Sequence, residues 1–281
     1  MTLPAILSAR VPSSPRDAPA SAPLVVERAG SVVVATLARP PVNALDADLV
    51  ARLADLVDGV SATAGTAVLH IRSGQRAFCA GADLALMQAC FATPAGVTTM
   101  VDLVRRMQRL FASIAAAPVV TIAEIGGAAL GGGFELALAC DLRVAASEAK
   151  LGLPEADLGL VPAAGGTQRL TRLAGEGVAK RLILGAEVLA GAEAQRLGLV
   201  QWAYPRAELA ERARALAQRI AAMPRAALAA NKACIAAAGS PARDGYADEI
   251  AATRALYESA ETRERVARFL AARAEHTKEE R

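Results

Sequence analysis

Two glutamates stand in segments where a carboxylate could do acid–base chemistry. Glu135 follows the glycine triplet 131–133 and opens an apolar stretch, and Glu155 follows Pro154 shortly before a glycine-rich loop. A glycine run at the start of a helix leaves backbone N–H groups free to face a developing negative charge. Two carboxylates beside such groups can move protons and activate water next to a carbonyl. The pattern therefore indicates an acid–base site beside a backbone anion-binding turn.

The residues around Glu135 predict that it is buried. Every residue from Leu136 to Cys140 is apolar, so the helix that carries Glu135 should lie inside the protein. A buried carboxylate without partners is costly, and its pKa tends to rise. The simpler alternatives are a glutamate that only stabilises a helix N-terminus and, for Glu155, an ordinary Pro-Glu start of a helical turn.

A second tight turn, Gly81-Ala82-Asp83, could complete an oxyanion hole. Such a hole needs two N–H donors about 3 Å from the oxyanion. Gly132 could supply one at a helix N-terminus, where the dipole favours negative charge, and Ala82 could supply the other. Either motif alone could be an ordinary turn, but their occurrence together with two carboxylates favours the site.

The sequence lacks the motifs that several other enzyme classes need. The chain has no GxSxG, GxGxxG or GxxxxGK[ST] segment, so serine-hydrolase, dinucleotide and P-loop readings are not supported. His70 lies in an apolar strand and is expected to be structural, while His276 lies in the polar tail. The cysteines show no CxxC spacing, so we expect no metal site. They are Cys79, Cys90, Cys140 and Cys234.

The elements that would position these residues alternate between strands and helices. The expected elements are a hairpin over 24–37, a helix from Asp46 or Asp48 to about 60, a strand at 67–72, a loop at 73–83, a helix at 95–117, a strand at 119–123, a helix at 134–140 and an extended segment at 141–145. This alternation is typical of an α/β fold.

The last third of the chain is expected to be helical. Gly and Pro separate the apolar-striped segments 167–173, 178–184, 192–197, 207–223, 226–238, 242–259 and 261–273, with one short strand at 199–204. Such helices could pack against the core or against a neighbouring subunit. We divide the chain into an Ala/Pro/Ser-rich leader expected to be disordered (1–23), a core (24–206) and a C-terminal helical region (207–281).

The composition indicates which partners and which cellular compartment the protein is expected to have. The formal net charge is +3, from 31 basic and 28 acidic residues, which is too small to indicate nucleic-acid binding. No apolar run is long enough to span a membrane, and prolines interrupt the leader where a signal peptide would need a clean apolar stretch. Cysteines without a disulfide pattern fit a cytoplasmic location.

Four sequence blocks resemble the enoyl-CoA hydratase/isomerase (crotonase) superfamily. They are 39–45 (RPPVNAL), 77–84 (AFCAGADL), 125–143 (IGGAALGGGFELALACDLR) and 152–170, which runs from Gly-Leu-Pro-Glu to Gly-Gly-Thr-Gln-Arg-Leu. The resemblance extends from about residue 24 to residue 273. It implies a spiral core of repeated ββα units and a C-terminal helical region that forms trimers, often paired into hexamers.

The resemblance also implies an acyl-CoA substrate, with coenzyme A entering as part of the substrate and no separate cofactor. Its thioester oxygen would lie between the N–H groups of Ala82 and Gly132, and Glu135 and Glu155 would be the catalytic carboxylates. The further substrate-binding positions that it implies are Val42, Ala80, Gly81, Asp83, Leu84, Gly131, Pro154 and Ala163.

Within the family that the chain resembles, members that only isomerise double bonds often lack the first glutamate, so the presence of both implies hydration. The expected reaction is syn addition of water to a trans-2-enoyl-CoA, with Glu135 taking the water proton and Glu155 delivering a proton to C2, or with these roles exchanged or shared. The enzymatic alternatives are an isomerase or another crotonase reaction, such as decarboxylation or carbon–carbon cleavage. A non-catalytic member that binds RNA or a protein is an alternative of a different class.

Some positions depart from the family pattern. Ala163 stands where many hydratases have glycine, so its methyl group could crowd the water. Ala85 and Ala272 stand where many members have a lysine, and the first block lacks the lysine of some members, so other cations would have to contact the CoA phosphates. The candidates are Arg39, Arg76 and Arg273. We expect the segment 84–107 to form part of the acyl pocket wall.

Overall fold

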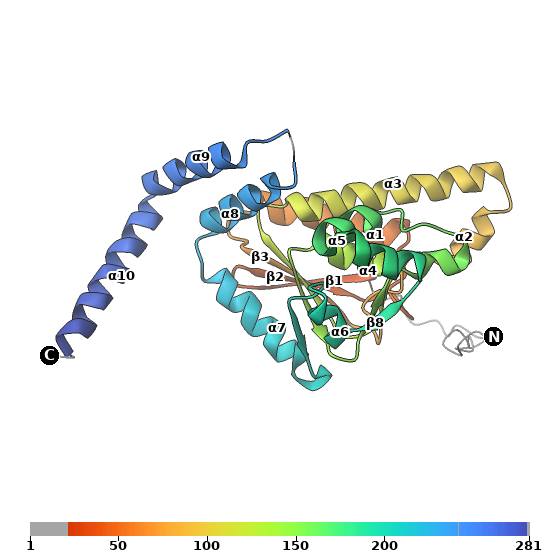
Figure 1. The fold of residues 1–281 in the computed structure, drawn as a ribbon, viewed down its shortest axis with the longest axis horizontal. Helices are drawn as coiled ribbons and strands as arrows, with labels where there is room; N and C mark the ends of the chain where they lie inside the picture. Colours follow the sequence, from red (N-terminus) through yellow and green to blue (C-terminus); the bar gives the residue numbers. More distant parts are fainter. Residues whose placement is uncertain (1–21, 241, 280–281) are drawn as a thin grey trace.

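A six-stranded sheet forms the body of the protein (Figure 1). The computed structural model describes residues 22–240 and 242–279, so nearly all of the expected leader lies outside the described residues. The strand order is β1-β2-β3-β4-β6-β9, in which the β1–β2 hairpin is antiparallel and every other pair is parallel. The strands are β1 (Leu24–Ala29), β2 (Val32–Leu37), β3 (Val68–Ser73), β4 (Val120–Ile125), β6 (Leu142–Ala146) and β9 (Trp202–Tyr204).

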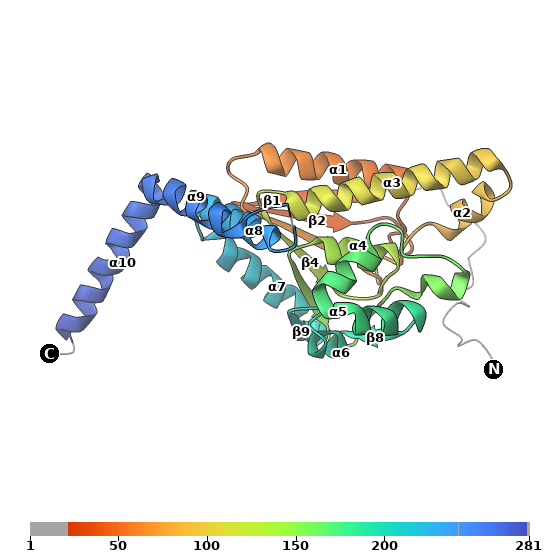
Figure 2. The same ribbon diagram turned by 45° about the horizontal axis from the view of Figure 1, so that its top comes forward.

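Helices cover both faces of this sheet. Figure 2 shows α1 (Ala47–Ala62) and α3 (Pro94–Ala116) running side by side above the sheet, with α7 (Arg206–Ala221) on its other side. The N-cap of α1 is Asp46, whose carboxylate accepts a hydrogen bond from Leu49 N, as the sequence predicts. Each of the three helices buries an apolar stripe, which is what fixes it on the sheet or on its neighbour.

A smaller sheet brings the two glutamate segments together. It consists of β5 (Ala129–Leu130), β7 (Lys150–Gly152) and β8 (Val188–Ala190). Strand β5 leads directly into α4 (Gly132–Ala139), and β7 leads into the 3₁₀ turn η1 (Pro154–Leu158). Because β5 and β7 are parallel neighbours, the helix that carries Glu135 and the turn that carries Glu155 leave the same end of the sheet.

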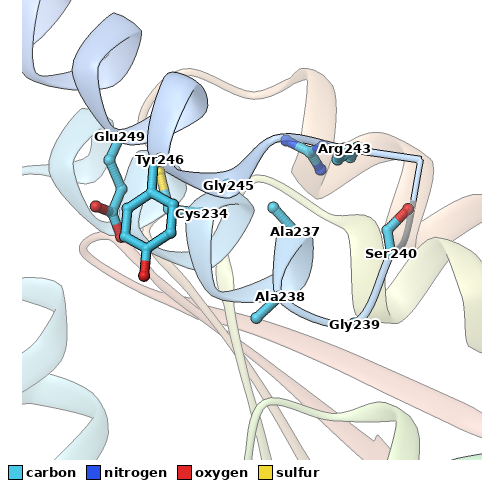
Figure 3. Close-up of a pocket in the computed structure, with 9 residues that line it drawn as sticks. All are labelled: Cys234, Ala237, Ala238, Gly239, Ser240, Arg243, Gly245, Tyr246 and Glu249. Carbon is cyan, nitrogen blue, oxygen red and sulfur yellow. The ribbon is translucent and has the colours of Figure 1, made fainter.

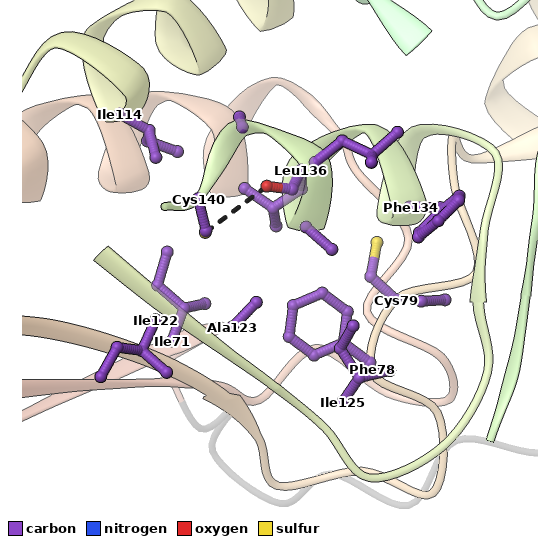
Figure 4. Close-up of a cluster of buried hydrophobic side chains, with 14 of the residues drawn as sticks. Ile71, Phe78, Cys79, Ile114, Ile122, Ala123, Ile125, Phe134, Leu136 and Cys140 are labelled. Atoms are coloured by element: carbon purple, nitrogen blue, oxygen red, sulfur yellow. Dashed lines mark hydrogen bonds between the residues drawn. The ribbon is translucent and has the colours of Figure 1, made fainter. Parts of the chain in front are cut away.

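Helix α4 lies in the centre of the core, and all of its residues are buried. Figure 4 shows it between Ile114 of α3 and the β-sheet residues Ile71 and Ile122, with Phe78 beneath it. Cys79 and Cys140 are buried thiols in this cluster and form no disulfide. Cys140 Sγ donates to Leu136 O over 3.5 Å. Glu135 thus lies in a helix that is otherwise apolar and is buried on all sides.

The remaining helices follow the predicted pattern with one difference, which is that the sequence does not predict α2. They are α2 (Leu84–Cys90), α5 (Gly166–Leu184), α6 (Gly191–Arg196), α8 (Arg225–Ala237), α9 (Gly245–Glu258) and α10 (Ala260–Glu279). The two helices predicted at 167–173 and 178–184 lie within α5. The predicted break between them is at Gly175, whose φ of 80° and ψ of 165° are not helical.

The C-terminal helices α9 and α10 form an arm that extends away from the body (Figures 1 and 2). None of the residues of α9 is buried. Within the described part of the chain, no helix has the length and apolar character needed to cross a membrane.

Candidate active site

Glu135 is buried in the first turn of α4, with 2% of its surface exposed. Its Oε1 accepts a hydrogen bond of 2.6 Å from Gly166 N. The pKa of Glu135 is raised to about 7. Burial is the largest cause and the negative charge of Glu155 adds to it, while hydrogen bonds from the backbone of Gly166 and Ala164 act in the opposite direction. A carboxyl group with this pKa exchanges protons readily near neutral pH.

Glu155 faces the glycine turn that opens α4. Its Oε1 lies 3.0 Å from the position that a Cβ atom on Gly131 would occupy. Burial also raises the pKa of Glu155. Its Oε2 is buried without a hydrogen-bond partner among the residues that the structure describes. A buried carboxylate oxygen of this kind is unusual unless a water or ligand occupies the space beside it.

The two predicted oxyanion amides belong to turns that touch each other. Ala82 N lies 3.7 Å from the Cβ position of Gly132, and Gly132 N lies 3.4 Å from the Cβ position of Gly81. Gly81 and Gly131 have φ of 99° and 52°, a region that favours glycine, so side chains are excluded where the turns meet. Gly132 is the first residue of α4, where an amide has no acceptor within the helix.

The structure therefore brings four predicted residues into one site: Ala82, Gly132, Glu135 and Glu155. Within residues 22–240 and 242–279, we find no hydrogen bond donated by the amide of Ala82 or of Gly132. Two amides without acceptors beside two carboxyl groups with raised pKa values can bind a carbonyl oxygen and transfer protons to and from the atoms next to it.

Three helices hold the loop that precedes α5. Gln108 of α3 donates from Nε2 to Ala163 O over 2.6 Å, and Arg169 of α5 donates from Nη1 to Ala164 O over 3.1 Å. Glu135 of α4 accepts from the next part of the loop, at Gly166 N. A Cβ atom on Gly165 would collide with the Arg169 guanidinium. The loop is thus positioned relative to both glutamates by side chains from outside it.

Sequence reasoning missed Gln108 and did not assign a role to Arg169. Arg169 lies within the fourth sequence block, so the motif contained a signal for it. Gln108 is one of several polar residues on α3, and its contact to a residue 55 positions away depends on the tertiary fold. No local pattern distinguishes it from its neighbours.

The other predicted substrate-binding residues lie on both sides of the Ala82 turn. Ala80 N donates to Val42 O over 3.0 Å, which joins the first two sequence blocks. Asp83 caps α2 by accepting from Leu86 N, and Leu84 begins that helix with half of its surface exposed. Pro154 is the first residue of η1. Ala163 O accepts the hydrogen bond from Gln108 Nε2.

Arg39 is turned towards two aspartates. Its Nε lies 2.9 Å from Asp46 Oδ2 and its Nη2 lies 2.7 Å from Asp83 Oδ2. A guanidinium engaged in this way has few N–H groups left for the CoA phosphates.

His70 is buried in β3, and its Nε2 lies 2.9 Å from Glu124 Oε2 of β4. The two groups are close, although their alignment does not meet the geometry of a hydrogen bond. No group of three or more potential metal-ligating side chains occurs among the described residues. None of the polar interactions described for His70 involves Glu135 or Glu155.

A hollow of about 460 Å³ lies at the junction of α8 and α9, well away from the two glutamates in sequence (Figure 3). Its walls include Cys234, Tyr246 and Glu249. It carries neither of the paired carboxylates nor the glycine turns, so we place the candidate active site at α4 and η1 and not in this hollow.

Comparison with known proteins gives consistent matches. A family model described as enoyl-CoA hydratase/isomerase matches residues 27–280. A probable enoyl-CoA hydratase of Bacillus subtilis is 43% identical over 191 residues, covering 68% of this chain and 72% of the relative. A crotonyl-CoA hydratase of Syntrophomonas wolfei is 40% identical over 199 residues, covering 70% and 75%. The crystal structure of an enoyl-CoA hydratase from Bacillus anthracis has a TM-score of 0.83 at 32% identity, covering 89% of this chain and 96% of that one.

Proposed function

The chain belongs to the enoyl-CoA hydratase/isomerase family and has its crotonase fold, and from this premise we propose that it adds water to trans-2-enoyl-CoA thioesters to give 3-hydroxyacyl-CoA. The observation that carries the proposal is the meeting of Glu135 and Glu155 beside the amides of Ala82 and Gly132. The names of the hydratase relatives support it. The proposed reaction needs no cofactor, because coenzyme A is part of the substrate.

The two amides would stabilise the charge that forms on the thioester oxygen. As the water oxygen attacks C3, electrons move through the conjugated system onto that oxygen, and an enolate develops. Ala82 N–H and Gly132 N–H would donate to it, and the N-terminal end of α4 adds a favourable dipole. One such donor typically lowers the barrier by about 3 kcal/mol. The glycine at position 132 serves this geometry, because a Cβ there would lie 3.0 Å from Met107 Cε.

The two carboxyl groups would carry out the proton transfers with one proton between them. In the proposed direction, ionised Glu135 takes a proton from water as its oxygen bonds to C3, and protonated Glu155 gives its proton to C2. The charge of Glu155 contributes to the raised pKa of Glu135, so the two groups titrate as a coupled pair. The roles of the two glutamates could therefore be exchanged or shared.

Purified protein incubated with crotonyl-CoA tests the proposal through the loss of enoyl absorbance. The wild-type chain should consume the substrate, and Glu135→Gln should lower kcat by at least about 100-fold, because general acid–base groups contribute about 10²–10⁴-fold. Glu148→Gln is the matched control, because Glu148 is exposed on the turn between β6 and β7 and the chemical change is the same.

The result that would refute hydration is a folded wild-type protein that leaves crotonyl-CoA unchanged. Conversion of a 3-enoyl-CoA to a 2-enoyl-CoA by that same protein would then support the isomerase alternative. A wild-type rate retained in Glu135→Gln would remove this residue from the mechanism.

A further inference from the structure

Arg39 connects the N-terminal caps of two helices. Asp46 caps α1 through Oδ1 and contacts Arg39 Nε through Oδ2. Asp83 caps α2 through Oδ1 and contacts Arg39 Nη2 through Oδ2. The remaining nitrogen, Nη1, donates to Ala44 O over 3.2 Å. Each carboxylate therefore uses one oxygen for its helix and the other for the same guanidinium.

The backbone held by this network includes the Ala82 amide. Leu45, which lies between Ala44 and Asp46, forms a parallel bridge with Ala82, and its N–H donates to Gly81 O over 2.8 Å. Ala82 is thus fixed on one side by the Gly81 carbonyl and on the other by Asp83. Rotation of either neighbouring peptide would turn the Ala82 N–H away from the Gly132 turn.

The chemistry of the contacts suits arginine in particular. A guanidinium presents several N–H groups in a fixed plane, whereas a lysine ammonium is a single point charge on a flexible stem. The hydrogen bond from Leu86 N and the contact with Arg39 hold the pKa of Asp83 below its usual value. Arg39, Asp46 and Asp83 are each about three-quarters shielded from solvent, so the contacts are only partly screened.

We propose that Arg39 is a positioning residue, which orients the Ala82 N–H for the thioester oxygen by holding Asp83 and Asp46 together. The inference rests on the proposed hydratase function and adds to it a residue that touches neither the acyl-CoA nor the water. It also explains why this cation has few N–H groups left for the CoA phosphates.

Steady-state kinetics with crotonyl-CoA provide the first test. Arg39→Gln should lower kcat by about 10- to 100-fold with little change in KM, because a displaced oxyanion donor weakens transition-state binding more than substrate binding. Arg39→Lys should fall between Arg39→Gln and wild type. Arg72→Gln is the control, since Arg72 contacts Glu27 and Thr36 on the hairpin side of the sheet, and it should retain the wild-type kcat.

Substitutions of the two aspartates distinguish an effect on the position of Ala82 from a general effect of losing a charge. Asn also caps helices well, so Asp83→Asn and Asp46→Asn both keep the caps and lose an ion pair. Asp83→Asn should lower kcat more, because only Asp83 adjoins Ala82. Equal kcat in Arg39→Gln and Arg72→Gln, or a larger effect of Asp46→Asn than of Asp83→Asn, would overturn the inference.

Amide hydrogen exchange tests the same inference without any turnover. In Arg39→Gln, the amides of Leu45, Leu86 and Met87 should exchange faster than in wild type and in Arg72→Gln, because their acceptors lie at Gly81 and Asp83. Unchanged exchange at these amides would overturn the positioning role. If the wild-type protein proved inactive on enoyl-CoA, the proposed function would fail while this measurement would still decide the role of Arg39.

Discussion

Burial of Glu135 links the candidate active site to the stability of the whole protein. Its pKa rises from 4.5 to about 7 on folding, with burial as the largest cause. Between these two values the folded state binds more protons than the unfolded state, so the free energy of unfolding falls as the pH rises. The contribution is fully favourable below about pH 4.5 and is lost by the time the pH passes 7.

Glu135→Gln should therefore remove this pH dependence, because glutamine does not titrate. The rise of the pKa from 4.5 to about 7 corresponds to about 3 kcal/mol, at about 1.4 kcal/mol per pH unit. We expect the variant to gain up to that amount of stability relative to wild type at pH 8 and to show little difference at pH 4. Urea unfolding at both pH values measures it, with Glu148→Gln as the control. An equal stability difference at pH 4 and pH 8 would contradict the raised pKa.

At the level of residues, the sequence predicts Glu135 better than Glu155. The glycine triplet and the apolar run after it indicate both the turn and the burial, and the structure has both. The position of Glu155 depends on the pairing of β5 with β7, in which Ala129 lies opposite Leu151. A pairing between strands of two and three residues leaves no periodicity in the sequence. The residues around Glu155 therefore make it a candidate carboxylate, but they do not predict the strand pairing that places it.

The elements were predictable where they are long. The first hairpin, α1 with its Asp46 cap and the long helix α3 all follow from apolar periodicity and capping residues. The sequence does not predict α2, because its seven residues are too few to show a helical periodicity. The break that the sequence predicts within α5 is confirmed at Gly175, where the backbone leaves the helical conformation.

The contact between α3 and the loop before α5 should influence catalysis from a distance. Removing the Gln108 side chain frees Ala163 O, and with it the loop that carries the Gly166 amide to Glu135. One hydrogen bond contributes about 0.5–1.5 kcal/mol, so Gln108→Ala should lower kcat by up to about 10-fold.

Gln168→Ala is the matched control for this change, because Gln168 is exposed and its amide donates to the adjacent Thr167 and not to the loop before α5. The kcat of both variants on crotonyl-CoA gives the comparison. Equal rates for the two would show that the loop keeps its position without Gln108.

At the scale of the whole molecule, the two ends of the helical region differ. Helix α7 buries Leu209, Ala213 and Ile220 against the sheet. The arm formed by α9 and α10 instead exposes large apolar side chains. They are Tyr246, Ile250, Tyr257, Val266, Phe269 and Leu270, each with more than half of its surface exposed. A series of this kind on one arm marks an association surface.

A second copy of this chain is the partner that we expect on the arm, in a homotrimer or a pair of trimers, as the family resemblance implies. Burying each large apolar side chain would stabilise the assembly by about 1.5–3 kcal/mol, so replacing two of them by charges should dissociate it.

Light scattering should give a multiple of the 28.8 kDa chain mass for wild type and a smaller species for the double variant Ile250→Glu, Phe269→Glu. Glu264→Gln changes the polar side of α10, where Glu264 pairs with Arg268 in solvent, and should leave the mass unchanged because exposed pairs contribute little. A wild-type protein that is monomeric at micromolar concentration would show that the exposed arm has another use.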